Sequence, residues 1–137
     1  MAFTGNATCD SFKLGCFTGQ FDFDADTLYI ALYTNAATLD ESTTAYTTTG
    51  EVVAAGYTAG GEVLTPTTAV VENNVAYISF QNVSWTGAFT ARGALIYKPG
   101  ANGAICVLDF GTDKTSTTTF TVQFPVASST SAIIRID

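Results

Sequence analysis

The stretch TLYIALYT, residues 27–34, decides the fold predicted for this chain. Its side chains alternate along an extended backbone, with Leu28, Ile30 and Leu32 on one side and Tyr29, Ala31 and Tyr33 on the other. A period of two residues is that of a β-strand, whose successive side chains point to opposite faces of a sheet. Because both sides carry large apolar or aromatic groups, we expect a strand that is half-buried or lies between two layers.

Five further segments show strand patterns separated by turns: AVVENNVAYISF (69–80), FTARGALIY (89–97), AICVLDF (104–110), TTTFTVQF (117–124) and AIIRI (132–136). The first is predicted to be a hairpin, because Asn73 and Asn74 readily take the left-handed conformations of a tight turn. In the second, Gly93 is expected to mark a bulge or a close contact. Strands joined by turns predict an all-β fold, an antiparallel β-sandwich or jelly-roll-like barrel, in one domain over residues 1–137.

The same alternation assigns side chains to faces. In residues 104–110, one face is expected to hold Ala104, Cys106, Leu108 and Phe110, and the other Ile105, Val107 and Asp109. In residues 117–124, Phe120, Val122 and Phe124 should share a face. In residues 132–136, Ala132, Ile134 and Ile136 should share a face. Cys106 is therefore predicted to lie in the core. Residues 110–117, FGTDKTST, resemble a phosphate loop only faintly, because Asp113 stands where a glycine should precede the lysine. We predict a turn there.

One short helix is expected in the N-terminal arm, residues 1–20. Asp10 or Ser11 could cap its start, and Gly19 could end it. Phe12, Cys16 and Phe17 are predicted to share its buried face.

The low content of charged residues indicates which kinds of molecule this chain is not expected to bind. Charged residues are 12% of the chain, the net charge is −7, and the five basic residues are dispersed. We therefore expect neither nucleic acid nor an anionic membrane as a partner. The N-terminal residues lack the pattern of a secretion signal, and no apolar run has the length of a membrane span. Three cysteines without a CxxC pair predict free thiols and synthesis in a reducing cytoplasm.

Groups for catalysis are sparse. The chain has no histidine and no GxSxG motif, so the usual acid, base and nucleophile arrangements are missing from the sequence. Asp22, Asp24 and Asp26 match the first ligand positions of a calcium-binding EF-hand, but Thr27 and Tyr33 occupy positions that require glycine and glutamate. We predict no enzymatic activity, no cofactor and no metal.

A long excursion, residues 35–66, is rich in Thr, Ala and Gly. It is too long for an ordinary connection and too aromatic for a disordered one. We therefore expect residues 37–61 to contact a neighbouring subunit, with Tyr46, Val52, Val53 and Tyr57 as the candidate interface residues. Replacing this segment by a short turn is expected to leave a folded β-domain. The aromatics Tyr29, Tyr33, Tyr46, Tyr57 and Trp85 could serve recognition, but packing within the fold is favoured for each.

Several segments, in this order, resemble a family of small structural proteins of tailed-bacteriophage virions. They are SFK (11–13), ALYT (31–34), ATLDESTTAYTTTGEV (37–52), GYTAGG (56–61), FTARGALIY (89–97) and VLDFGTDKT (107–115). The resemblance brings no catalytic residues. It implies a protein made in the host cytoplasm that becomes part of the virion.

Within that family we expect a capsid decoration or cement protein, a homotrimer bound to the major capsid protein on the outside of the head. Small β-proteins at symmetric junctions can tie capsid subunits together, and closed oligomers fit such junctions. A tail, neck or fibre-attachment component is the second interpretation. A carbohydrate-binding module is the third, based on the aromatics and the acidic clusters.

Overall fold

The computed structural model describes residue 3 and residues 5–136. Along the chain the elements are β1 (Ala7–Thr8), α1 (Asp10–Thr18), β2 (Leu28–Tyr33), β3 (Glu62–Leu64), β4 (Val70–Glu72), β5 (Val75–Ile78), β6 (Val83–Thr86), β7 (Thr90–Tyr97), β8 (Ala104–Thr115), β9 (Thr119–Val122) and β10 (Ile134–Ile136). All the paired strands are antiparallel. The predicted all-β, sandwich-like fold with one short helix is confirmed.

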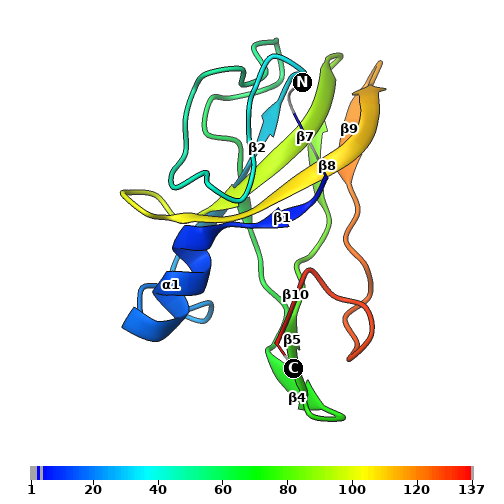
Figure 1. The fold of residues 1–137 in the computed structure, drawn as a ribbon. Helices are drawn as coiled ribbons and strands as arrows, with labels where there is room; N and C mark the ends of the chain where they lie inside the picture. Colours follow the sequence, from blue (N-terminus) through cyan, green and yellow to red (C-terminus); the bar gives the residue numbers. More distant parts are fainter. Residues whose placement is uncertain (1–2, 4, 137) are drawn as a thin grey trace.

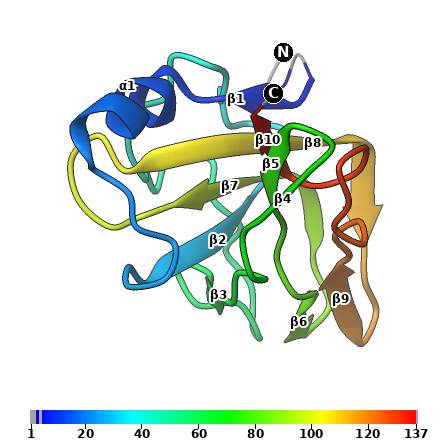
Figure 2. The same ribbon diagram turned by 90° about the horizontal axis from the view of Figure 1, so that it is seen from below.

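The strands form one large sheet and two small ones (Figures 1 and 2). The large sheet has the order β1-β8-β7-β2-β3, and the small sheets have the orders β10-β5-β4 and β6-β9. In the view from below, the β10-β5-β4 sheet lies in front of β7 and β8 (Figure 2). None of the described residues belongs to a helix long and apolar enough to cross a bilayer.

Strand β2 is buried on both faces, as its alternation predicted. Leu28, Ile30 and Leu32 belong to one hydrophobic core, whereas Ala31 and Tyr33 belong to a second. The large sheet is therefore the middle layer of the molecule, and each of its faces needs a cover.

The small sheets and the helix cover the first face. The residues they contribute to the first core include Phe12, Ile78, Trp85, Phe120, Val122 and Ile134, and Phe80, just after β5, joins them. Trp85 and Phe120 face one another across β6 and β9, with ring centroids 6.3 Å apart. The predicted packing of Tyr33, Tyr57 and Trp85 inside the fold is confirmed, because all three are buried.

The first part of the long excursion covers the second face, whereas Val52 and Tyr57, later in the excursion, belong to the first core. Its Ala37 and Leu39 are buried against Leu95 and Val107 of the large sheet. Main-chain hydrogen bonds hold it there: the Thr34 N–H donates to the Gly50 carbonyl, the Val52 N–H to Leu32, and the Ala104 N–H to Thr44, at 2.8, 3.0 and 3.0 Å. Ala37, Leu39 and Tyr46 thus cover the second face from a segment that contains none of the named strands.

Two irregularities shape the β7–β8 pair. A register shift lies between Ala91 and Gly93, and a Cβ at Gly93 would lie 2.5 Å from the Leu108 carbonyl oxygen, so both expectations for this glycine are confirmed. A second shift lies between Ile96 and Tyr97, which pair with Cys106 and Ala104.

The second shift corrects the predicted faces at the start of β8. An extra residue in one strand of a pair interrupts the alternation. Ile105 therefore joins Cys106 in the first core, whereas Ala104 joins Val107 in the second. The prediction that Ala104 and Cys106 share a face is wrong, while the burial of Cys106 is confirmed.

The end of β8 also differs from the prediction. Residues 111–115 continue the strand, where Lys114 and Thr115 pair with Ala91 and Thr90, so the turn predicted for residues 110–117 is wrong at most of its positions. The predicted hairpin at Asn73 and Asn74 is confirmed, with φ of 53° and 66° between β4 and β5.

The predicted helix is present, but its N-cap and its buried face differ from the prediction. Cys9 is its N-cap rather than Asp10 or Ser11, and Gly19 ends it with φ of 72°. Phe12 is buried, but Phe17 is 90% exposed. At 3.6 residues per turn Phe17 lies about 140° around the helix from Phe12, so the two cannot share a narrow buried face.

The cover over the second face argues against the expectation that residues 37–61 can be removed. Replacing them with a short Gly-Ser linker would expose Ala31, Tyr33, Leu95 and Val107 to water. Because burial of apolar surface contributes about 25 cal/mol per Å², we expect the shortened chain to lose cooperative thermal unfolding, as measured by near-ultraviolet circular dichroism. An unfolding transition at the temperature of the parent would contradict this assignment.

Candidate docking groove and buried glutamate

The four candidate interface residues lie in different surroundings. Val52 and Tyr57 are buried in the first core, and Tyr46 is half-buried against the second. Only Val53 is at the surface, where it is 96% exposed. The aromatic and aliphatic side chains that suggested an interface are thus used mainly to attach the excursion to its own sheet.

Glu51 is the centre of that attachment, although nothing in the sequence analysis singled it out. Its side chain lies in the interior, with the residue only 7% exposed. One carboxyl oxygen accepts a hydrogen bond from the Tyr46 hydroxyl at 2.6 Å. The other accepts from the Tyr57 hydroxyl and from the Gly60 N–H, both at 2.7 Å.

Further tyrosines extend this network into the large sheet. The Tyr57 hydroxyl accepts from the Leu32 N–H at 2.8 Å, and the Tyr97 hydroxyl donates to the Gly60 carbonyl at 2.7 Å. The rings of Tyr46 and Tyr97 stack with centroids 4.9 Å apart. Strand β2 and strand β7 are thereby both connected to the excursion.

Burial and the nearby Glu51 keep these hydroxyl groups protonated. Desolvation, followed by the hydrogen bond to Glu51, raises the pKa of Tyr46 to about 12. The same two causes raise the pKa of Tyr57 further. Both phenols therefore act as hydrogen-bond donors at neutral pH. Both carboxyl oxygens of Glu51 already accept hydrogen bonds from the chain itself, and Glu51 lines neither of the two surface hollows of the molecule. We therefore assign Glu51 a structural role.

Removing the Glu51 side chain tests this role. We expect Glu51→Ala to lower the free energy of unfolding by about 3 kcal/mol, because three donors lose their acceptor in a buried site. Denaturant titration would measure the change. Glu62→Ala, at an exposed glutamate on β3, is the matched control and should change stability by less than about 0.5 kcal/mol. Equal effects of the two substitutions would refute the role.

The aspartates that resemble a calcium loop are hydrogen-bonded within their own turn. An oxygen of Asp22 accepts from the N–H groups of Asp24 and Ala25 at 3.0 and 3.2 Å. Asp26 accepts from the Asp22 N–H and forms an ion pair with Lys98 at 3.0 Å. Within the described part of the chain, no group of three or more potential metal ligands is present.

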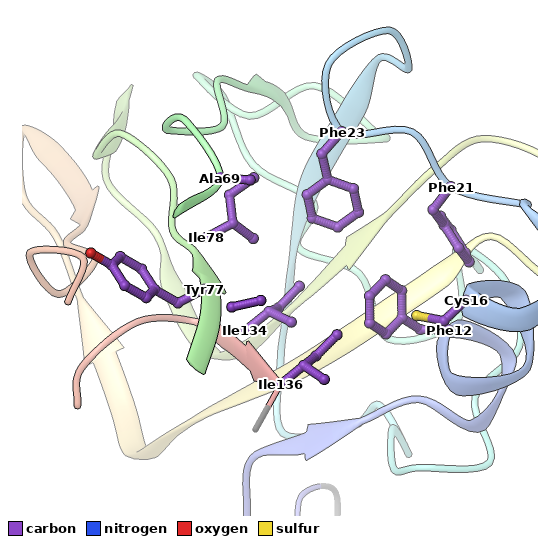
Figure 3. A pocket seen from close by; sticks show the side chains of 10 residues that line it. Phe12, Cys16, Phe21, Phe23, Ala69, Tyr77, Ile78, Ile134 and Ile136 are labelled. Atoms are coloured by element: carbon purple, nitrogen blue, oxygen red, sulfur yellow. The ribbon is translucent and has the colours of Figure 1, made fainter. Parts of the chain in front are cut away.

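An apolar groove lies between α1, the turn at residues 21–23 and the β10-β5-β4 sheet (Figure 3). Its volume is about 280 Å³, and it is lined by Phe12, Cys16, Phe21, Phe23, Ala69, Ala76, Tyr77, Ile78, Ile134 and Ile136. In Figure 3 the side chains of Phe12, Phe23 and Ile134 point toward a common space. No lining residue has a formal charge at neutral pH, so the groove is suited to an apolar ligand or partner.

Exposed apolar side chains accompany the groove. Phe17 on α1 is 90% exposed, Val71 on β4 is 73% exposed, and Ile136 on the groove wall is 58% exposed. α1, β4 and β10 lie at the same end of the molecule, the lower end in Figure 1. Concentrated apolar exposure is typical of surfaces that contact another protein.

A second hollow, of about 380 Å³, lies between the end of β8 and β9. It is lined by Phe110, Lys114, Thr115, Ser116, Thr119, Phe120, Thr121, Val122 and Gln123. Its hydroxyl, amide and amino groups give it a polar character that the groove does not have.

Comparisons with protein-family models, curated proteins and solved structures found no match to this chain.

The three thiols provide a test of the site geometry. Cys9 and Cys106 are buried and Cys16 is exposed at the groove. Burial raises the pKa of Cys9 to about 12 and also raises that of Cys106, which lowers the thiolate fraction available for reaction. We expect a maleimide to add once to the native protein and three times after denaturation, as counted by intact mass. Native modification of Cys106 would show that the facing of β8 is wrong.

Proposed function

We propose that the chain is a structural component of a tailed-bacteriophage virion, and specifically a trimeric capsid decoration protein that binds the major capsid protein. The observation that carries the proposal is the apolar groove with its exposed apolar neighbours on α1, β4 and β10. The resemblance of the quoted segments to small virion proteins supplies the biological setting.

The chemistry of the groove favours recognition over catalysis. Its only ionisable side chains are the Cys16 thiol and the Tyr77 phenol, and the chain has no histidine. An apolar groove contributes affinity through burial, and its small number of polar groups keeps the cost of desolvation low. Many such contacts on a symmetric shell add up to strong attachment.

We place the proposed docking surface on the groove rather than on the excursion. Residues 37–61 have most of their large apolar side chains turned inward. A separate edge could serve self-association: β3 is the last strand of the large sheet, Val63 on it is 54% exposed, and Glu51 bridges the same side of β2. Val53, two residues after Glu51, adds an exposed apolar side chain near this edge.

Counting copies in purified virions tests the proposal. We expect the chain to be present in a fixed ratio to the major capsid protein, as measured by quantitative mass spectrometry, because a decoration protein occupies every equivalent site on the shell. Imaging should place it on the outer surface of the head. A few copies, or a few dozen, would instead favour the tail, neck or fibre-attachment alternative, and absence from the particle would refute the virion proposal.

The second hollow is the observation that favours a carbohydrate-binding module. Lys114, Thr119 and Gln123 offer hydrogen-bonding groups beside the ring of Phe110, a combination that can hold a sugar. A glycan array with the purified chain separates this alternative from the structural role.

A further inference from the structure

We infer that the groove between α1 and β10 receives an apolar segment of a partner protein that carries lysine or arginine on its flanks. The inference rests on the proposed docking function and specifies the chemistry of the partner. It follows from the lining of the groove, the charge of the aspartates that alternate with that lining and the use of the chain's own basic residues.

The lining selects apolar side chains. Phe12, Ile78 and Ile134 are buried at the inner side of the groove, and Ile136 stands at its outer side with 58% of its surface exposed. The volume of about 280 Å³ is close to the lower limit of small-molecule pockets, about 300 Å³. It therefore suits a small number of protein side chains inserted from outside.

Two exposed aspartates alternate in sequence with two residues of this lining. In the sequence Phe21-Asp22-Phe23-Asp24, both aromatic residues line the groove and both aspartates are exposed. The nearby Asp26 is already balanced by Lys98, with an ion-pair distance of 3.0 Å. Asp22 and Asp24 thus provide negative charge beside an apolar surface, which favours a partner with positive charge next to its apolar residues.

A second copy of the chain does not meet this requirement. Of its five basic residues, Lys13, Arg92 and Lys98 form ion pairs with Asp10, Asp109 and Asp26. Lys114 on β8 is exposed and forms none of these ion pairs, but it directly follows Asp113 in the chain. Arg135 lies between two groove residues on β10, and its guanidinium donates to the Ser129 carbonyl. It therefore brings one positive charge near the groove, against the two negative charges of Asp22 and Asp24. Another copy would also bring a net charge of −7 to these aspartates. A second copy thus offers one exposed lysine outside the ion pairs and a negative net charge, so we assign the positive flanks to a different protein.

Cys16 allows the occupancy of the groove to be measured directly. It lines the groove and is exposed, whereas Cys9 and Cys106 are buried. We would measure the rate of maleimide addition to the native full chain with two synthetic peptides. One has a Leu-Phe-Leu core between lysine pairs, and the other has the same core between glutamate pairs.

We expect the lysine-flanked peptide to slow the labelling of Cys16 and the glutamate-flanked peptide to leave it unchanged. Protection should decrease at high salt, because exposed charges are screened. Equal protection by both peptides would refute the charge requirement, and protection by neither would refute the groove as a docking site. Labelling that slows with increasing concentration of the chain alone would instead identify a second copy as the occupant.

Two pairs of variants locate the contact, with affinity for the lysine-flanked peptide measured by fluorescence anisotropy. Asp24→Asn should weaken binding about two- to fivefold, the effect of one exposed ion pair, whereas Asp113→Asn, at an exposed aspartate on β8, should not. Ile136→Asp should weaken it by about tenfold or more, because a charge would enter an apolar contact. Val126→Asp, at a valine that is 89% exposed and outside the groove lining, is the matched control.

Both altered groove residues are exposed, so circular dichroism should show that all four variants remain folded. If Asp113→Asn weakens binding as much as Asp24→Asn, and Val126→Asp as much as Ile136→Asp, the peptide binds elsewhere and the inference fails. The outcome is separable from the copy number in virions: the peptide measurements use the isolated chain, and a virion protein could still dock through another surface.

Discussion

The hydrogen bonds that Glu51 accepts from Tyr46, Tyr57 and Gly60 connect distant points of the excursion to one buried position. Each of these groups would be costly to bury without a partner. Their mutual satisfaction allows a loop to lie in the interior of a protein, where the main chain is usually organised as helix or sheet. Since Tyr57 also accepts from the Leu32 N–H, the position of the loop is tied directly to the central strand.

The attachment of the excursion through Glu51 explains why the two faces of the large sheet have different covers. One face of the large sheet is covered by two small sheets and a helix, together with Val52 and Tyr57 of the excursion, and the other face is covered by the first part of the excursion, with Ala37, Leu39 and Tyr46. Small residues let the loop approach the sheet closely: Gly61 has φ of 81°, and a Cβ there would lie 1.8 Å from the Ile30 carbonyl oxygen. The unusual composition of the excursion is therefore explained by coverage of the chain's own sheet, and a partner is not needed to explain it.

At the proposed docking end, apolar side chains are exposed rather than turned inward. Around the groove, the helix and the β10-β5-β4 sheet leave apolar side chains such as Phe17 and Val71 in contact with solvent. The buried polar groups of the excursion are hydrogen-bonded within the chain. This end, in contrast, has exposed apolar surface that another molecule could bury. The acidic residues beside Phe21 and Phe23 add a charge preference to that surface.

The sequence by itself determined strands β2, β5, β7 and β9, the Asn73-Asn74 hairpin, the end of the helix at Gly19 and the burial of Cys106, because each follows from local periodicity or from backbone preference. It did not reveal Glu51, since a single glutamate among Thr and Gly residues has no local signal. The extra residue that turns Ala104 and Ile105 to other faces was equally hidden, because a bulge depends on the partner strand. Only the tertiary structure brought α1, residues 21–23 and β10 together into a groove, because their side chains are far apart in sequence and meet only when the sheets pack.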